Sequence, residues 1–327
     1  MKTRFRFFAA LMVCLLAACG DSTPKAVVST GDILAKEAPA QVAQARVALI
    51  MKTLTNPFFI EMEKGARQAQ KEYRVDLRVR TATQETSIEQ QIQLVEQEIE
   101  AKTQAIVIAP GDSMRLVPVL KKAQDAGIHI VNIDNRLNPE AMAASGMKPV
   151  PFISVNNEQG AYEVAQFMAS KVSAPAQAVV LEGIRTADNA EQRKRGALRA
   201  FKENPHIHVV ASESANWKID EAYQLTKTLF KAHPKVSLVF CANDMMAIGV
   251  IKYVQETGNR TVQIVGFDAL EEAKTAIKAG QLLATVNQQA DRQGYQGVIT
   301  ALELLKGGTP PMEIMVPTQV VTAANVN

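Results

Sequence analysis

The chain alternates between short runs rich in Val and Ile and longer segments whose apolar residues recur at intervals of three and four. The short runs are typical of buried strands, and the longer segments are typical of amphipathic helices. Strands are expected in the first half of the chain at residues 47–51, 75–81, 105–109 and 128–133. In the second half they are expected at residues 152–155, 178–181, 208–211, 238–241, 263–267 and 282–286.

Helix-start signals fall between these strands. Asn56-Pro57 places a capping side chain before a proline in the first turn, so a helix is expected from there through Lys71. Thr86-Ser87 opens a second helix, whose apolar stripe runs from Ile88 to Ile99. Further helices are expected to begin near residues 157, 189, 219, 243, 270 and 291.

The fold class that this rhythm predicts is α/β. Strands that return every 25 to 30 residues, with a helix between them, indicate right-handed βαβ units and a parallel sheet. The rhythm alone is compatible with one eightfold barrel or with two doubly wound domains. About ten strands and a polar break at residues 137–149 favour two domains.

The N-terminus has the pattern of an export signal. Residues 1–6 are basic, and the apolar run that follows is too short to span a bilayer, so residues 1–18 are expected to be a signal peptide. The run ends in Leu16-Ala17-Ala18-Cys19-Gly20, which resembles the lipobox of bacterial lipoproteins. The resemblance implies lipidation of Cys19, with residues 19–45 as a flexible tether. A plain cleavable signal is the alternative, and both predict export from the cytoplasm.

Composition indicates a folded protein with a balanced surface. Hydrophobic residues make up 47% and charged residues 21%, which excludes a disordered or disulfide-stapled chain. Lys and Arg number 36 against 33 Asp and Glu, and removing Lys2, Arg4 and Arg6 with the signal leaves 33 against 33. Such a surface lacks the basic footprint of a nucleic-acid-binding protein. Cys241, in an apolar run, is expected to be a small buried hydrophobe.

Signatures of enzymes are missing from the sequence. It contains no Gly-rich dinucleotide fingerprint, no phosphate-binding Gly-Lys-Ser/Thr loop, no paired-histidine zinc helix, no Gly-x-Ser-x-Gly elbow and no Cys-x-x-Cys pair. His206 and His208 share one face of a strand but lack a nearby third ligand. We therefore expect a protein that is not an enzyme and that carries neither a cofactor nor a metal.

Polar and aromatic residues instead gather just past the carboxyl ends of the expected strands, where open α/β sheets bind ligands. They occur in five segments: Thr55-Asn56-Pro57-Phe58-Phe59, Ile133-Asp134-Asn135-Arg136, Asn243-Asp244, Phe267-Asp268 and Thr285-Val286-Asn287-Gln288. Each segment alone is also typical of a helix cap or a turn. Five of them converging on one edge favour a ligand pocket.

The order of these segments resembles the ribose-binding protein family, the periplasmic sugar-binding proteins of bacterial ABC transporters. The matching pieces are Asn-Pro-Phe-Phe, Ile-Asp, an arginine ahead of Arg-Gly, Asn-Asp, Gly-Phe-Asp and Thr-Val-x-Gln, between about residues 46 and 322. The resemblance implies a type I periplasmic binding protein with two doubly wound parallel-sheet lobes joined by a three-segment hinge. It implies an N-terminal lobe at residues 46–154 plus 289–312 and a C-terminal lobe at residues 155–288 plus 313–327.

The resemblance also implies which residues bind the ligand. They are Asn56, Phe58, Phe59, Asp134, Asn135, Arg193, Trp217, Asn243, Asp268 and Gln288. Planar polar groups can bind two adjacent sugar hydroxyls, and aromatic rings can cover the C–H faces. In ribose binders an arginine directly follows the aspartate, whereas Asn135 intervenes here before Arg136. This departure weakens the case for ribose, and Trp217, in place of a stacking phenylalanine, suits a hexose or another larger polyol.

The expected function is that of a monomeric solute-binding lipoprotein. It captures a monosaccharide or polyol between two closing lobes and delivers it to the permease of an ABC importer. Its expected location is the periplasm or cell envelope, with a membrane anchor through the lipid at Cys19. The alternative is a sensory protein that presents ligand occupancy to a membrane receptor or kinase. Transcription repressors of this fold are disfavoured, because they need a helix-turn-helix where the signal peptide stands.

Overall fold

The computed structural model describes residues 45–259 and 261–327. The expected signal peptide, the lipidation at Cys19 and the tether lie outside these residues, apart from Ala45. Ala45 is buried, and its carbonyl accepts a hydrogen bond from the Asp76 amide at 3.1 Å, so it is part of the folded body. Among the helices in the described ranges, none is both long and apolar enough to cross a membrane.

The first lobe contains a six-stranded sheet in the order β11-β5-β4-β3-β1-β2, with every neighbouring pair parallel. Its strands are β1 (Arg46–Met51), β2 (Asp76–Thr81), β3 (Ala105–Ile108), β4 (His129–Ile133), β5 (Phe152–Ser154) and β11 (Glu313–Met315). Its helices are α1 (Pro57–Tyr73), α2 (Ile88–Glu100), α3 (Val117–Asp125), α4 (Pro139–Ala144) and α10 (Ala290–Leu305).

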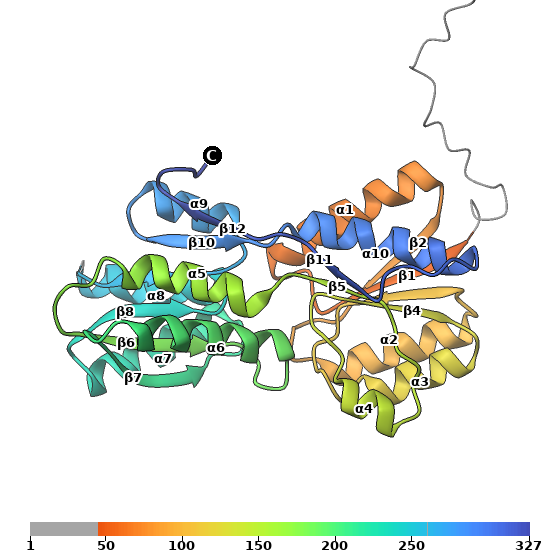
Figure 1. The fold of residues 1–327 in the computed structure, drawn as a ribbon, viewed down its shortest axis with the longest axis horizontal. Helices are drawn as coiled ribbons and strands as arrows, with labels where there is room; N and C mark the ends of the chain where they lie inside the picture. The colour runs from red at the N-terminus through yellow and green to blue at the C-terminus, as the bar shows by residue number, and fades with distance from the viewer. Residues whose placement is uncertain (1–44, 260) are drawn as a thin grey trace, which may run out of the picture. The chain divides into compact units, whose positions relative to one another are not determined.

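Helices cover both faces of this sheet (Figure 1), and for that reason the central strands β1 and β3 are almost entirely apolar rather than alternating. Along β1, Leu49 and Met51 point to the side of α1 and α10, whereas Ala48 and Ile50 point to the side of α2 and α3. The two helices on the first side approach closely, because Gly294 of α10 lies against the backbone of α1.

The second lobe contains a sheet in the order β12-β10-β9-β8-β6-β7, in which β12 alone runs antiparallel to its neighbour. Its strands are β6 (Ala176–Glu182), β7 (Ile207–Ser214), β8 (Val236–Cys241), β9 (Gln263–Val265), β10 (Ala284–Asn287) and β12 (Gln319–Thr322). Its helices are α5 (Asn157–Ala169), α6 (Asp188–Glu203), α7 (Ile219–Ala232), α8 (Asp244–Thr257) and α9 (Glu271–Lys278).

Both lobes wind their strands in the same order. In each, the second strand lies outside the first, and the third to fifth strands extend the sheet on the other side. The winding therefore reverses next to β1 in one lobe and next to β6 in the other, and ligands of such sheets bind at this reversal. The predicted α/β class with two doubly wound lobes is confirmed.

Three elements differ from the sequence-based expectation. β11 was expected in the C-terminal lobe with the rest of residues 313–327, but it pairs in parallel with β5 of the first sheet. The polar break at residues 137–149, which favoured a division into two domains, contains α4 and lies within the first lobe. The tail of the chain forms β12, which no apolar run predicted and which extends the second sheet beside β10.

Candidate functional site

Helix α1 and its cap bring a side-chain amide and two aromatic rings to the carboxyl edge of the first sheet. Asn56 caps α1, because its Oδ1 accepts from the Phe58 amide at 3.1 Å, and its Nδ2 donates to Glu85 Oε1 at 2.9 Å. Pro57 fits the first turn, where no intrahelical donor is needed. The rings of Phe58 and Phe59 meet edge to face, with centroids 5.0 Å apart. The local sequence thus fixes both rings beside the cap.

A buried ion pair lies beside these rings. Asp134 follows β4 in the left-handed region, with φ of 61°, and its Oδ2 lies 2.9 Å from Nζ of Lys52, which follows β1. Both side chains are only 3% exposed. The Ser154 hydroxyl donates to the Asp134 carbonyl at 2.6 Å and holds this turn in place. The charges of Lys52 and Asp134 therefore lie buried at the carboxyl edge of the first sheet.

Arg193 of α6 is the centre of the second-lobe part of the site. Its Nε donates to Asn157 Oδ1 at 2.8 Å, and its Nη1 donates to the Ala242 carbonyl at 2.9 Å. Its guanidinium carbon lies 3.8 Å from the centroid of the Phe267 ring and 5.5 Å from the centroid of the Trp217 ring. The guanidinium plane is therefore fixed before any ligand contact is made.

A carboxylate and a side-chain amide contact the guanidinium of Arg193. Arg193 Nη1 lies 3.5 Å from Asp268 Oδ1, and Nη2 donates to Gln288 Oε1 at 3.3 Å. Gln288 Nε2 donates to the same Asp268 oxygen at 2.6 Å. The predicted trio from three distant segments therefore forms one hydrogen-bonded group.

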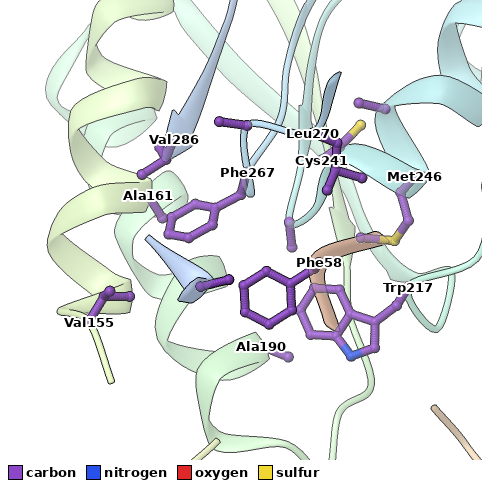
Figure 2. Packing of buried hydrophobic residues seen from close by; sticks show 14 of the residues in the cluster. Phe58, Val155, Ala161, Ala190, Trp217, Cys241, Met246, Phe267, Leu270 and Val286 are labelled. Carbon is purple, nitrogen blue, oxygen red and sulfur yellow. The ribbon is translucent and has the colours of Figure 1, made fainter. Parts of the chain in front are cut away.

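Trp217 packs where a glycine leaves room for it. A Cβ at Gly183, just after β6, would lie 2.0 Å from Cζ2 of the indole. Asn243 caps α8 through its Oδ1, which accepts from the Met246 amide at 2.9 Å, and its Nδ2 donates to the Trp217 carbonyl at 3.4 Å. Figure 2 shows Phe58, Trp217 and Phe267 among the buried residues of one hydrophobic cluster.

These residues enclose one small cavity of about 20 Å³ between the two lobes. Nine of the ten predicted site residues line it. The full lining is Lys52, Asn56, Phe58, Phe59, Glu85, Asp134, Asn189, Arg193, Trp217, Asn243, Asp268 and Gln288. That they bind a ligand stays a prediction.

Asn135 is the exception, and its expected role as a ligand contact needs correction. It is fully buried but does not line the cavity. Its Nδ2 donates to the Pro110 carbonyl at 3.0 Å and to Ser113 Oγ at 3.2 Å, and its Oδ1 accepts from the Asn189 amide at 3.2 Å. Its side-chain atoms therefore form hydrogen bonds within the first lobe and with the second lobe.

Further hydrogen bonds join the lobes at the same place. The Ser113 amide donates to the Thr186 carbonyl at 3.0 Å, and the Asp188 amide donates to Ser113 Oγ at 3.0 Å. We call these bonds and the bond from Asn189 to Asn135 the interlobe contact. Of its residues, only Asn189 also lines the cavity, where its Nδ2 donates to Asp134 Oδ1 at 3.3 Å.

Three lining residues were missed from the sequence. Lys52 directly follows the buried strand β1, so the rule that ligands bind past the carboxyl ends of strands could have found it. Glu85 lies in a polar loop that resembles any solvated turn. Asn189 was interpreted only as the start of a helix.

Burial determines the ionisation of the site. It raises the pKa values of the Glu85 and Asp268 carboxyls, and for Asp268 the nearby Arg193 cation opposes this shift. Burial likewise lowers the pKa of Arg193, against the attraction of Asp268 and Asp134. Across residues 45–259 and 261–327, no three His, Cys, Asp or Glu side chains are grouped as metal ligands. The arrangement therefore offers hydrogen-bonding polar groups and aromatic rings to a ligand.

Comparison with known proteins identifies the family. A family model described as a periplasmic binding protein domain matches residues 47–309. The D-ribose/D-allose-binding protein of Pseudomonas aeruginosa is 37% identical over 320 residues, which cover 96% of this chain and 97% of that protein. The D-allose-binding periplasmic protein of Escherichia coli is 31% identical over 268 residues, with 81% and 86% covered.

A solved structure shows the same fold. It is an ABC transporter periplasmic solute binding protein from Actinobacillus succinogenes with bound D-allose, which is 37% identical. It superposes with a TM-score of 0.81 over 86% of this chain and 98% of that chain.

The two lobes with one cavity between them define a type I periplasmic binding protein, a class of binding proteins and not of enzymes. The chain belongs to the periplasmic binding protein family, and the predicted resemblance to ribose-binding proteins is confirmed.

Proposed function

We propose that this protein binds a monosaccharide between its two lobes and delivers it to an ABC importer. The observation that carries the proposal is the lining of the cavity, where three carboxylates, a guanidinium, an ammonium group and four side-chain amides from both lobes surround aromatic rings. A sugar presents adjacent hydroxyls that donate and accept together, which planar carboxylate, amide and guanidinium groups can match in pairs. The rings of Phe58 and Trp217 suit the apolar faces of such a ligand.

The energetics of this lining are sufficient for tight binding. Hydrogen bonds to charged groups contribute about 1.5–3 kcal/mol each. Micromolar affinity corresponds to only about 8 kcal/mol. Several bonds to Asp134, Arg193 and Asp268 therefore suffice, even after the ligand and the lobes have been ordered.

We place the ligand among the aldoses of five or six carbons. The support comes from relatives that carry D-ribose and D-allose in their names and from the neighbour with bound D-allose. The indole of Trp217 and the additional cation of Lys52 favour a hexose, because they add apolar surface and a further hydroxyl partner.

We further propose that the protein acts outside the cytoplasm as a lipoprotein. The lipobox-like Leu16-Ala17-Ala18-Cys19-Gly20 and the preceding apolar run support export and a lipid anchor. Metabolic labelling with a clickable fatty acid tests the anchor: label is expected on the wild-type protein and not on Cys19→Ser. Label retained by Cys19→Ser would overturn the assignment of the anchor to this residue.

Calorimetry with a panel of D-ribose, D-allose, other pentoses and hexoses, and myo-inositol tests the binding function. At least one aldose is expected to bind at micromolar concentration or tighter. Asp134→Asn and Asp268→Asn are expected to weaken it by at least about tenfold each, because one charged hydrogen-bond partner is lost. The exposed Asp220→Asn is the matched control. Binding of no sugar, or equal binding by all variants, would refute the proposal.

Sugar uptake by a deletion strain tests delivery. Loss of uptake that the intact gene restores is expected of an importer component. Normal uptake with a lost transcriptional response to the sugar would instead support the sensory alternative.

A further inference from the structure

The loop that carries Asp268 has a strained backbone. It spans residues 266–270 between β9 and α9. Asp268 has φ of 125° and Ala269 has φ of 54°, both in the left-handed region that disfavours side chains. Such a conformation persists only where neighbouring groups hold it. The hydrogen bond from the Asp268 amide to the Val286 carbonyl, at 2.8 Å, fixes one point of the loop.

Asp244 holds the far side of the same loop. It is the first residue of α8 and is fully buried. Its Oδ2 accepts from the Leu270 amide at 2.9 Å, and its own amide donates to the Phe267 carbonyl at 2.7 Å. A Cβ at Gly266 would lie 2.1 Å from Asp244 Oδ1, so the carboxylate occupies space that only glycine leaves free.

Thr285 bonds both Asp244 and the residue that follows Asp268 in the loop. Its hydroxyl donates to Asp244 Oδ1 at 2.7 Å, and its Oγ1 accepts from the Ala269 amide at 3.2 Å. Thr285 belongs to β10 and is fully buried. The carboxylate and the hydroxyl together therefore bind the two amides that follow Asp268.

We propose that Asp244 and Thr285 are positioning residues that hold Asp268 in its ligand-binding orientation without touching the ligand. Neither lines the cavity, whereas Asp268 does and is hydrogen-bonded there to Gln288. The inference rests on the proposed function, because it assigns a supporting role to a site expected to bind sugar. It explains why a carboxylate is buried one residue after the ligand-site residue Asn243.

The charges around Asp244 provide a readout that a purely structural role would not affect. The titratable groups that face it are Arg193 of α6, Asp268 of the loop and Cys241 of β8. Burial raises the pKa of Asp268, and the nearby charge of Asp244 raises it further. Removing that charge is therefore expected to lower the pH at which Asp268 takes up its proton.

The test uses the full-length protein with Asp244→Asn and Thr285→Val, two nearly isosteric changes. The matched control is Thr226→Val, which removes a buried hydroxyl that bonds only within α7. Calorimetry with D-allose and D-ribose is expected to show binding weakened by about tenfold in both variants, or about 1.4 kcal/mol. The ratio between the two sugars is expected to stay unchanged. In Asp244→Asn alone, the midpoint of the pH profile of binding is expected to move to lower pH.

Hydrogen exchange without sugar tests the same inference independently of the ligand. The amides of Ala269 and Leu270 are expected to exchange faster in both variants and at the wild-type rate in Thr226→Val. Wild-type exchange in both variants would overturn the positioning role, and so would wild-type affinity together with an unmoved pH midpoint. If the wild-type protein binds no sugar, the proposed function fails, and the exchange rates still decide whether Asp244 and Thr285 hold the loop.

Discussion

Arg193 is the residue that ties the second-lobe part of the site together. Its side chain is 3% exposed, and it donates to a side chain of α5, to a backbone carbonyl after β8 and to the side-chain oxygen of Gln288 after β10. A buried cation is tolerated only when its donors are used and a counter-charge is near. Asp268 supplies that counter-charge, so the two residues are expected to act as one unit in binding.

The buried carboxyls give the ligand-free protein a characteristic dependence on pH. The pKa values of Glu85 and Asp268 are raised by burial, and that of Asp244 is raised to about 7. The folded state therefore holds protons that the unfolded chain releases near pH 4. The resulting stabilisation is full below that pH and is lost as the pH rises through the folded-state value near 7.

Urea unfolding without sugar is expected to show lower stability at pH 8 than at pH 5. The loss for a single such group is at most about 1.4 kcal/mol per pH unit. Asp244→Asn is expected to reduce the difference, because asparagine carries no proton to release. Equal or greater stability at pH 8 in the wild-type protein would contradict this assignment.

The part of the site that lies directly after strands could be predicted from the sequence. Asn56, Asp134, Asn243, Asp268 and Gln288 each follow a strand, and parallel strands bring their carboxyl ends to one edge. The role of Asn135 could not be predicted in this way. The left-handed turn at Asp134 sends the two neighbouring side chains in different directions, which no spacing rule contains. Glu85 was missed because a half-buried loop carboxylate at a cavity has the same local sequence as a solvated one.

At the scale of elements, the helices α1 and α10 determine where the aromatic rings and Gln288 lie. The contact uses glycine on both sides: a Cβ at Gly65 would lie 1.7 Å from the Asp291 carbonyl oxygen, and one at Gly294 would lie 2.0 Å from the Met62 carbonyl oxygen. Backbone atoms cannot move aside as a flexible side chain can. The helices would therefore have to separate to admit a methyl group.

Gly294→Ala is expected to destabilise the protein by about 1–3 kcal/mol, the usual cost of overpacking. Sugar affinity is expected to fall as well, because Phe58 lies in the first turn of α1 and α10 follows Gln288. Chemical denaturation and calorimetry measure the two effects. Arg292→Ala, at an exposed position of the same helix, is the control and should leave both unchanged. A fully stable Gly294→Ala would show that the contact is not tight.

The regular βαβ elements were predictable, because the spacing of apolar residues and the helix-capping residues indicate them from the local sequence. α4 and β11 were not, for a different reason in each case. The six residues of α4 are too few to reveal a helical period, although Asn138-Pro139 is a helix-start signal. The three residues of β11 are mostly exposed, and they form a strand only because β5 offers them a parallel edge. Tertiary pairing, rather than local pattern, creates that strand.

At the scale of the whole molecule, we expect the interlobe contact to influence how readily the lobes close. Ser113, Asn135, Thr186 and Asp188 join the lobes without lining the cavity, so they favour the closed arrangement whichever ligand is bound. A ligand that binds only the closed arrangement has an apparent affinity proportional to the population of that arrangement. Closure and affinity are therefore coupled through residues that never touch the ligand.

Ser113→Ala removes the acceptor for the Asp188 amide and is expected to open the lobes more often. One hydrogen bond contributes about 0.5–1.5 kcal/mol, which corresponds to an affinity lower by roughly two- to tenfold. D-allose and D-ribose should lose the same factor, mainly through faster release, because no ligand contact changes. Fluorescence transfer between dyes on the two lobes measures closure, and Ser145→Ala, whose hydroxyl bonds within the first lobe, is the control. A selective loss for one sugar would mean that Ser113 acts on the ligand and not on closure.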